Sequence, residues 1–159
     1  MTIVGITGHQ HRPGIDWPWV KSAMADALDR LPSVTVAYSS LAVGADQVFA
    51  RVALRRGIEL VAIIPMPEYE ECFSPSDLRK FRNLLSKSKV IGLPGANSRE
   101  QAFYQAGKYV VDHSDILIAV WDEHPASGEG GTDDIVAYAR SRHCHITLIN
   151  PIMQKVNYT

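Results

Sequence analysis

The sequence predicts an α/β fold that is doubly wound, with a mostly parallel sheet and helices on both faces. Apolar runs of strand length alternate along the chain with amphipathic segments whose apolar residues recur every three or four positions. The runs "LVAII" and "ILIAVW" are continuously apolar rather than alternating. Strands covered on both faces have this pattern, and it is typical of parallel sheets.

The expected strands follow the apolar runs in chain order. They are "TIVGIT" (2–7), "VTVAYS" (34–39), "ELVAIIP" (59–65), "KVIGL" (89–93), "ILIAVW" (116–121) and "HITLIN" (145–150). The expected helices lie between them at about 17–31, 45–57, 75–87, 98–113 and 131–142. The closing "QKVNYT" (154–159) reads as a loose tail.

Length and composition limit the class of protein. The 159 residues, 46% hydrophobic and 21% charged, suit one globular domain over residues 1–159. A net charge of -1 provides no global basic field for nucleic acid or membrane. No apolar run approaches the roughly 20 residues that span a bilayer. The start lacks a signal-peptide pattern, so we expect a cytoplasmic protein without a membrane partner.

Unusual residues gather in the loops that follow strands. These loops read "GHQHRPG" (8–14), "SSLAVGAD" (39–46), "PMPEYEECF" (65–73) and "DEHPASGEGGTDD" (122–134). In open parallel sheets the ligand crevice lies beyond the carboxyl ends of the strands. The four loops are therefore expected to build one composite pocket.

The glycine-rich turn before the last helix suits a phosphate. Gly128, Gly130 and Gly131 permit positive φ and close approach of a ligand, and Thr132 stands where an N-cap hydroxyl would stand. Backbone N–H groups and the helix dipole then favour an anion. Asp133 would meet a sugar hydroxyl or face solvent. The alternative is a flexible turn before a capped helix.

The first loop offers further ligand contacts. Gly8 permits close approach after the first strand, with His9 beside it, and Arg12 offers a bidentate contact to phosphate or carboxylate. His9 and His11 are two residues apart, but no cluster with convincing ligand spacing follows. We therefore expect neither a metal site nor a cofactor.

The second loop provides a tight entry into a helix. Gly44 permits the turn, Ser40 is exposed at the end of the strand, and Asp46 falls in the first helical turn. Asp46 either complements the helix dipole or accepts a hydrogen bond from ribose.

The third loop is acidic. Tyr69 would stack on a base, and Glu68 or Glu70 would contact ribose or act on a glycosidic carbon. A solvated acidic loop is an equal alternative.

The motifs "GITGH", "S-LAVGAD", "DHSDILIAVWD" and "GEGGTDD", in this order, resemble those of the SLOG superfamily. These Rossmann-like nucleotide-binding domains include DNA-processing protein A and the Lonely Guy phosphoribohydrolases. The resemblance covers nearly the whole chain. It implies a Rossmann-like fold and a nucleotide or nucleotide-derived ligand, with phosphate on the turn of Gly130, Gly131 and Thr132. It also implies a homo-oligomer, for which Trp17 and Trp19 supply either core packing or a subunit interface.

One departure from the resembled pattern separates two functions. Lonely Guy enzymes have P-G-G-x-G-T-x-x-E, whereas Ile135 stands here at the position of the glutamate. We therefore favour a module that binds a nucleotide-like small molecule. The alternative is an N-glycosidase or phosphoribohydrolase in which Glu68 or Glu70 stabilises the oxocarbenium ion. DNA is not the expected partner, because the chain lacks a basic stripe interleaved with aromatic residues.

Overall fold

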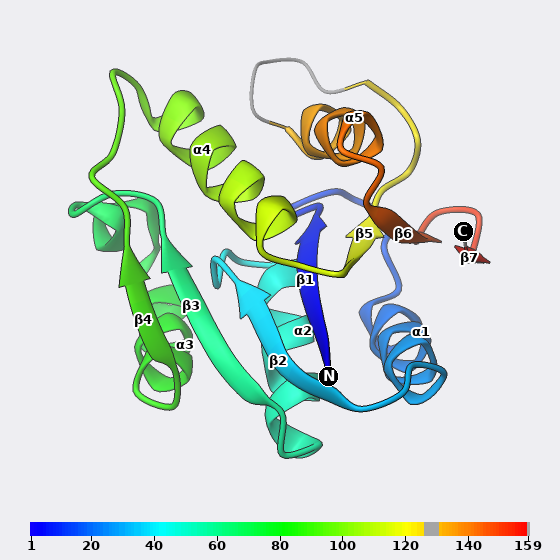
Figure 1. Ribbon diagram of the computed structural model, residues 1–159. Coiled ribbons are helices and arrows are strands. Elements are labelled where there is room, and N and C mark those ends of the chain that lie inside the picture. Colours follow the sequence, from blue (N-terminus) through cyan, green and yellow to red (C-terminus); the bar gives the residue numbers. More distant parts are fainter. Residues whose placement is uncertain (126–130, 159) are drawn as a thin grey trace.

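The strands form one sheet in the order β4-β3-β2-β1-β5-β6-β7 (Figure 1). The structure is a computed structural model that describes residues 1–125 and 131–158. Each neighbouring pair of strands is parallel except β6 with β7. The predicted doubly wound, mostly parallel α/β fold is confirmed.

The elements of the described chain follow the predicted alternation. The strands are β1 (Thr2–Gly8), β2 (Val34–Ser39), β3 (Glu59–Ile64), β4 (Lys89–Gly92), β5 (Ile116–Val120), β6 (His145–Asn150) and β7 (Lys155–Tyr158). The helices are α1 (Trp17–Asp29), α2 (Ala45–Arg55), α3 (Pro75–Leu85), α4 (Arg99–Asp112), α5 (Thr132–Ser141) and the short 3-10 helix η1 (Tyr69–Cys72). None of these helices combines the length and apolarity that a membrane span requires.

The expected loose tail over residues 154–159 is wrong for Lys155–Tyr158, which forms the antiparallel strand β7 against β6. The reversal depends on Asn150, whose Oδ1 accepts the backbone N–H groups of Ile152 at 3.1 Å and Met153 at 3.0 Å. The strand is short and mostly exposed, so it lacks the apolar run by which the other strands are recognised.

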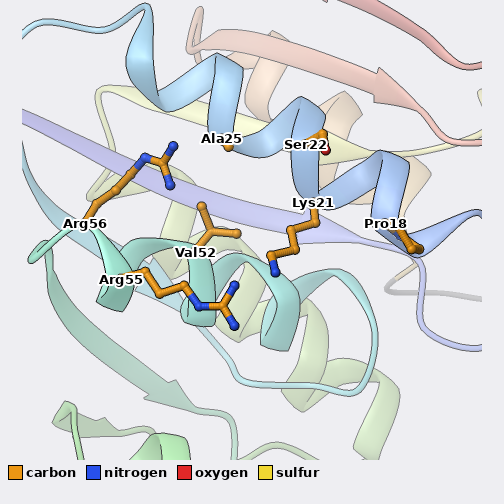
Figure 2. A pocket seen from close by; sticks show the side chains of 7 residues that line it. All are labelled: Pro18, Lys21, Ser22, Ala25, Val52, Arg55 and Arg56. Carbon is orange, nitrogen blue, oxygen red and sulfur yellow. The ribbon is translucent and has the colours of Figure 1, made fainter.

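Helices cover both faces of the sheet. In Figure 1, α1, α2 and α3 lie on one face, and α4 and α5 lie on the other. Figure 2 shows α1 and α2 running side by side, with Val52 of α2 between them. Met24 of α1 and Phe49 of α2 are fully buried in the core of this face. Trp17 and Trp19 are partly buried and pack against the same core, so they serve the packing role considered from the sequence.

The helix N-termini fall into two groups. Asp16, Ser74 and Ser98 cap α1, α3 and α4, since each side chain accepts a backbone N–H of the first turn. The helices α2 and α5 begin instead at Gly44 and Gly131, and neither has a side-chain cap. A helix start without a cap leaves backbone N–H groups to be satisfied by other acceptors.

Candidate functional site

A cleft of about 1190 Å³ opens along the carboxyl edge of the sheet. The chain runs from β1 through β2 and β3 to β4 on one side, and then returns to place β5 on the other side of β1. This reversal is the topological switch point at which open α/β sheets bind ligands. The predicted residues that line the cleft are Gly8, His9, Arg12, Ser40, Asp46, Tyr69, Gly131 and Thr132.

The two candidate catalytic glutamates are not brought to the cleft. Glu68 is exposed, and neither Glu68 nor Glu70 is among the residues that line it. The carboxylate of Glu70 accepts hydrogen bonds from Arg82 Nη2 at 2.7 Å and Nε at 3.1 Å. The hydrogen bond from Arg82 holds the pKa of Glu70 below its ordinary value. The structure therefore gives Glu70 a partner on α3 and leaves any carboxylate chemistry in the cleft to other residues.

The start of α5 differs from the prediction. Gly131, and not Thr132, occupies the N-cap, and Thr132 is the first helical residue. Gly131 has φ -73° and ψ 177°, the extended backbone of an N-cap residue, so it does not use the positive φ that glycine permits. Gly128 and Gly130 lie outside the described residues. Both Gly131 and Thr132 line the cleft, so the first turn of α5 faces it.

Two further predicted residues, Gly44 and Asp133, are not among the residues that line the cleft. Gly44 has φ 93°, and the N–H of the following Ala45 donates to the carbonyl oxygen of His9 at 3.1 Å. Gly44 thus holds the start of α2 against the loop that follows β1. Asp133 lies in the first turn of α5, and among the described residues its buried Oδ1 has no hydrogen-bond partner.

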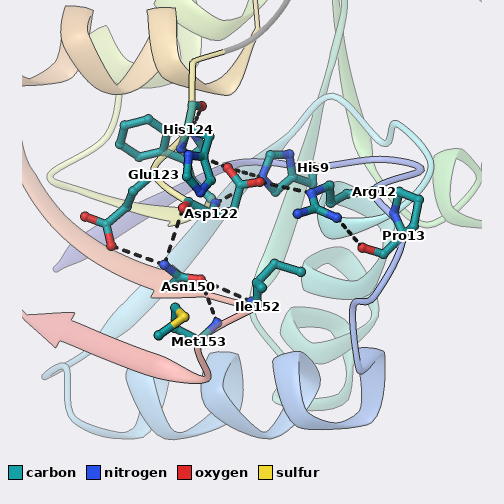
Figure 3. Close-up of polar contacts among 10 residues, drawn as sticks. His9, Arg12, Pro13, Asp122, Glu123, His124, Asn150, Ile152 and Met153 are labelled. Carbon is teal, nitrogen blue, oxygen red and sulfur yellow. Dashed lines mark hydrogen bonds and ion pairs between the residues drawn. The ribbon is translucent and has the colours of Figure 1, made fainter.

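A cluster at the switch point joins the loops after β1 and β5 (Figure 3). Arg12 Nε donates to Asp122 Oδ2 at 3.0 Å, and the backbone N–H of Asp122 donates to His9 Nε2 at 3.0 Å. The N–H of His124 donates to Asp122 Oδ1 at 3.0 Å. Arg12 Nη1 also donates to the carbonyl oxygen of Pro13. Arg12 lines the cleft, as the predicted ligand contact requires, but its Nε and Nη1 are paired within the protein.

The charge states of the cluster follow from these contacts. Burial opposes the ionised form of Asp122, but the hydrogen bonds from His124 and Arg12 outweigh it and hold the pKa of Asp122 below its ordinary value. Burial lowers the pKa of His9 by more than Asp122 raises it. His9 is therefore neutral at pH 7, with Nε2 accepting and the proton on Nδ1. Asp122 was missed from the sequence, although it is the second residue after β5 and ends one of the quoted motifs.

Loss of the Asp122 carboxylate is expected to cost stability. In Asp122→Ala, Arg12 and the N–H of His124 lose their acceptor, so the free energy of unfolding should fall by about 2–4 kcal/mol. Urea denaturation at pH 7 measures this change. The matched control Asp29→Ala breaks an exposed pair with Arg56 and should cost much less stability than Asp122→Ala.

The pH dependence of Asp122→Ala provides a second check. The pKa of Asp122 is lowered by folding, so its contribution is present above the ordinary carboxyl pKa and is lost as the pH falls through the folded value. The difference between wild type and variant should be constant above about pH 5 and shrink below about pH 4. A difference that stays constant down to pH 2 would contradict the assignment.

Asp46 is one of four acidic residues that line the cleft, together with Asp77, Glu100 and Asp122. Among the described residues it accepts one side-chain hydrogen bond, a long one of 3.4 Å from the N–H of Ala42. Asp46 keeps partial solvent access, yet it is surrounded so deeply by protein atoms that burial raises its pKa from 3.8 to about 7. The neighbouring Ser39 hydroxyl braces the backbone, donating to the carbonyl oxygen of Asp46 at 3.0 Å. Ser40 lies on the wall of the cleft.

Tyr69 lines the cleft, but the residue is only 4% exposed. It makes edge contacts with Phe73, Phe81 and Phe103 at centroid distances of 5.1, 5.5 and 6.1 Å. Burial, and then the charge of Asp46, raise the pKa of Tyr69 well above its ordinary value. A ring packed in this way has no open face, so the expected stacking on a base is not supported. Within residues 1–125 and 131–158, no group of three or more His, Cys, Asp or Glu side chains is placed to hold a metal ion.

Comparisons with known proteins identify the fold. No protein-family model matches the chain, and no curated protein matches it. DNA processing protein A from Streptococcus pneumoniae is similar in structure, with a TM-score of 0.68 and 16% identity over 94% of this chain. The same protein from Helicobacter pylori, studied for its single-stranded DNA binding mode, has a TM-score of 0.67 and 15% sequence identity over 99% of this chain. The structural-genomics target TM1055 has a TM-score of 0.59 and 15% sequence identity over 94% of this chain.

The chain spans about half the length of the Streptococcus protein, 50%, and 68% and 75% of the other two. At these identities the likeness shows the fold. The Rossmann-like fold implied by the SLOG resemblance is therefore confirmed.

Proposed function

We propose that the cleft binds a nucleotide or a nucleotide-derived small molecule, with its phosphate at the start of α5. One observation carries this proposal. The uncapped first turn of α5, at Gly131 and Thr132, faces the cleft at the switch point of the sheet. The N–H of Asp134 donates to the carbonyl oxygen of Gly131 at 3.1 Å, but the N–H groups before it have no acceptor one turn earlier in the helix, and the helix dipole adds positive potential. These are the properties of phosphate sites in Rossmann-like folds.

The start of α2 is less suited to phosphate although it also has a glycine N-cap. The N–H of Ala45 already donates to His9, and the N–H of Gln47 donates to the carbonyl oxygen of Ala42 at 3.2 Å. The carboxyl group of Asp46 lies in this turn and lines the cleft, where it would repel an anion, whereas the two carboxyl groups in the first turn of α5, Asp133 and Asp134, do not line the cleft. We assign to Asp46 a part of the ligand that donates hydrogen bonds, such as the ribose hydroxyls or an exocyclic amine.

The proposal is tested by adding nucleoside monophosphates, NAD, ADP-ribose, cyclic dinucleotides and a single-stranded oligodeoxynucleotide to the pure protein. A ligand at a hundred times its Kd should add about 2.7 kcal/mol of stability, which thermal unfolding detects. Chromatography shows whether the ligand is recovered intact. We expect a nucleotide to stabilise the protein and the oligonucleotide to have no effect, because the chain carries a net charge of -1.

Thr132→Glu is expected to remove phosphate binding without destabilising the folded protein. A glutamate in the first turn of α5 interacts favourably with the helix dipole but adds a third negative charge beside Asp133 and Asp134, so the unliganded protein should stay within about 1 kcal/mol of wild type. Its carboxylate repels phosphate, and the ligand-induced shift in Tm should disappear. Thr35→Glu, at an exposed position of β2, should keep the shift. Retention of the full shift in Thr132→Glu would place the phosphate elsewhere.

The second candidate is an N-glycosidase that uses Asp46 in place of Glu68 or Glu70. The pKa of about 7 favours it, because a carboxyl group poised near neutral pH is suited to general acid or base catalysis. This enzyme would release free base from a nucleoside monophosphate. In that case Asp46→Asn would abolish release while Thr132→Glu would abolish binding. Recovery of an intact ligand from the wild type would favour the binding module.

A further inference from the structure

A second hollow lies on the outer face of the molecule, in the groove between α1 and α2 (Figure 2). Its volume is about 310 Å³. It shares no lining residue with the large cleft, so it is a separate feature of the surface. The residues that line it are Pro18, Lys21, Ser22, Ala25, Val52, Arg55 and Arg56.

Two cations from neighbouring helices meet in this groove. Figure 2 shows the side chains of Lys21 and Arg55 reaching toward one another beside Val52. Within the described chain neither forms an ion pair, whereas Arg56 is held by two hydrogen bonds to Asp29 at 3.1 and 3.2 Å. Arg51 is close enough that the charge of Arg55, after burial, lowers the pKa of Arg51. The groove therefore concentrates positive charge without a compensating carboxylate at Lys21 and Arg55.

Helix stability accounts for only part of this arrangement. A cation at Arg55 or Arg56 interacts favourably with the C-terminal end of α2. Lys21 lies just past the first turn of α1, where the helix dipole offers a cation no benefit. The two like charges also repel each other across the groove. An anion between them would remove this repulsion.

We propose that the groove binds the phosphate dianion of a small molecule, either a phosphomonoester or inorganic phosphate. A phosphate carries a charge of about -1.5 to -2 at pH 7, which matches two unpaired cations better than a carboxylate does. Ser22 adds a hydroxyl donor, while Pro18, Ala25 and Val52 supply apolar contact for a short carbon chain. The volume lies at the lower limit for small-molecule sites.

The test is titration of the full chain with glycerol 3-phosphate, inorganic phosphate and acetate, followed through backbone amide chemical shifts. We expect glycerol 3-phosphate or inorganic phosphate to shift the amides of Lys21, Ser22 and Arg55. Acetate should bind at least about tenfold more weakly, because its single charge makes fewer charge-assisted hydrogen bonds. A monoester that binds more tightly than inorganic phosphate identifies the ester as the ligand, and equal binding identifies free phosphate.

A double variant makes the assignment falsifiable. Lys21→Gln with Arg55→Gln should weaken phosphate binding at this groove by at least about tenfold. The control Arg79→Gln with Lys80→Gln removes the same two residue types from α3, outside both hollows, and should bind as the wild type does. Three results would each overturn the proposal. They are equal phosphate affinity in the wild type and in the first variant, phosphate-induced amide shifts confined to the start of α5, and acetate binding as tight as that of phosphate.

Discussion

Asp46→Asn is expected to raise the free energy of unfolding at pH 8 by about 2–4 kcal/mol. Burial raises the pKa of Asp46 from 3.8 to about 7, so at pH 8 the folded protein contains a carboxylate in surroundings that oppose its charge. Asparagine is nearly isosteric and neutral, and its Oδ1 still accepts the N–H of Ala42. The gain should come at the expense of ligand binding if Asp46 contacts the ligand.

The pH profile decides this prediction. Between about pH 4 and pH 7 the folded protein holds a proton on Asp46 that the unfolded chain has released, so the stability of the wild type falls as the pH rises. The free energy of unfolding should fall by at most about 1.4 kcal/mol per pH unit across this window, and the partial solvent access of Asp46 reduces this slope. Urea denaturation of both proteins should give equal stabilities near pH 4 and the full difference above pH 7.

Asp26→Asn provides the matched control, since Asp26 is exposed on α1. It should leave both the stability and its pH dependence within about 0.5 kcal/mol of wild type. If wild type and Asp46→Asn had parallel pH profiles from pH 4 to pH 8, Asp46 would not carry the proton.

Gly44→Ala is expected to lower the free energy of unfolding by about 2–5 kcal/mol. Gly44 has φ 93°, which is strained for alanine. A Cβ there would lie 2.5 Å from the carbonyl oxygen of His9 and 2.8 Å from Cα of Gln10. These are backbone atoms, so the loop after β1 or the start of α2 would have to move. Either movement would displace Asp46 or His9 and should weaken ligand binding as well.

Gly57→Ala separates backbone strain from the clash. Gly57 also has positive φ, 69°, but a Cβ there meets nothing within 4 Å. The substitution should cost only about 1–2 kcal/mol. Denaturant unfolding of both variants at pH 7 measures the difference. Equal losses of stability would show that the approach of Gly44 to His9 and Gln10 is not tight.

The sequence was sufficient to predict most of the fold because both sheet and helix patterns are strong. The apolar run at 116–121 forms β5, buried on both faces, and each of the predicted helices was found with ends within two residues. The strand β7 was missed because its stability comes from pairing with β6 and from the turn made by Asn150. Neither is visible in local periodicity.

The site was predicted less well because side-chain partners depend on the tertiary fold. The sequence placed Arg12 and Glu70 in the right loops, but it contained no sign that Asp122 and Arg82 would pair with them. The high pKa of Asp46 follows from burial, which the position of a carboxylate in a helix turn does not predict. Strand order, by contrast, brought the predicted loops to a common edge as the general rule requires.

β1 lies between β2 and β5 in the sheet, so the cleft can form during folding only after β5 has paired with β1. β1 pairs with β5, and Ile3 N–H donates to Asp115 Oδ2 at 2.9 Å across 112 positions of the chain. His9 and Asp122, which join the two walls, are 113 positions apart. Such non-local contacts close long loops and form slowly compared with helices. A chain that has not yet added β5 lacks one wall of the site, so ligand binding reports the completion of folding.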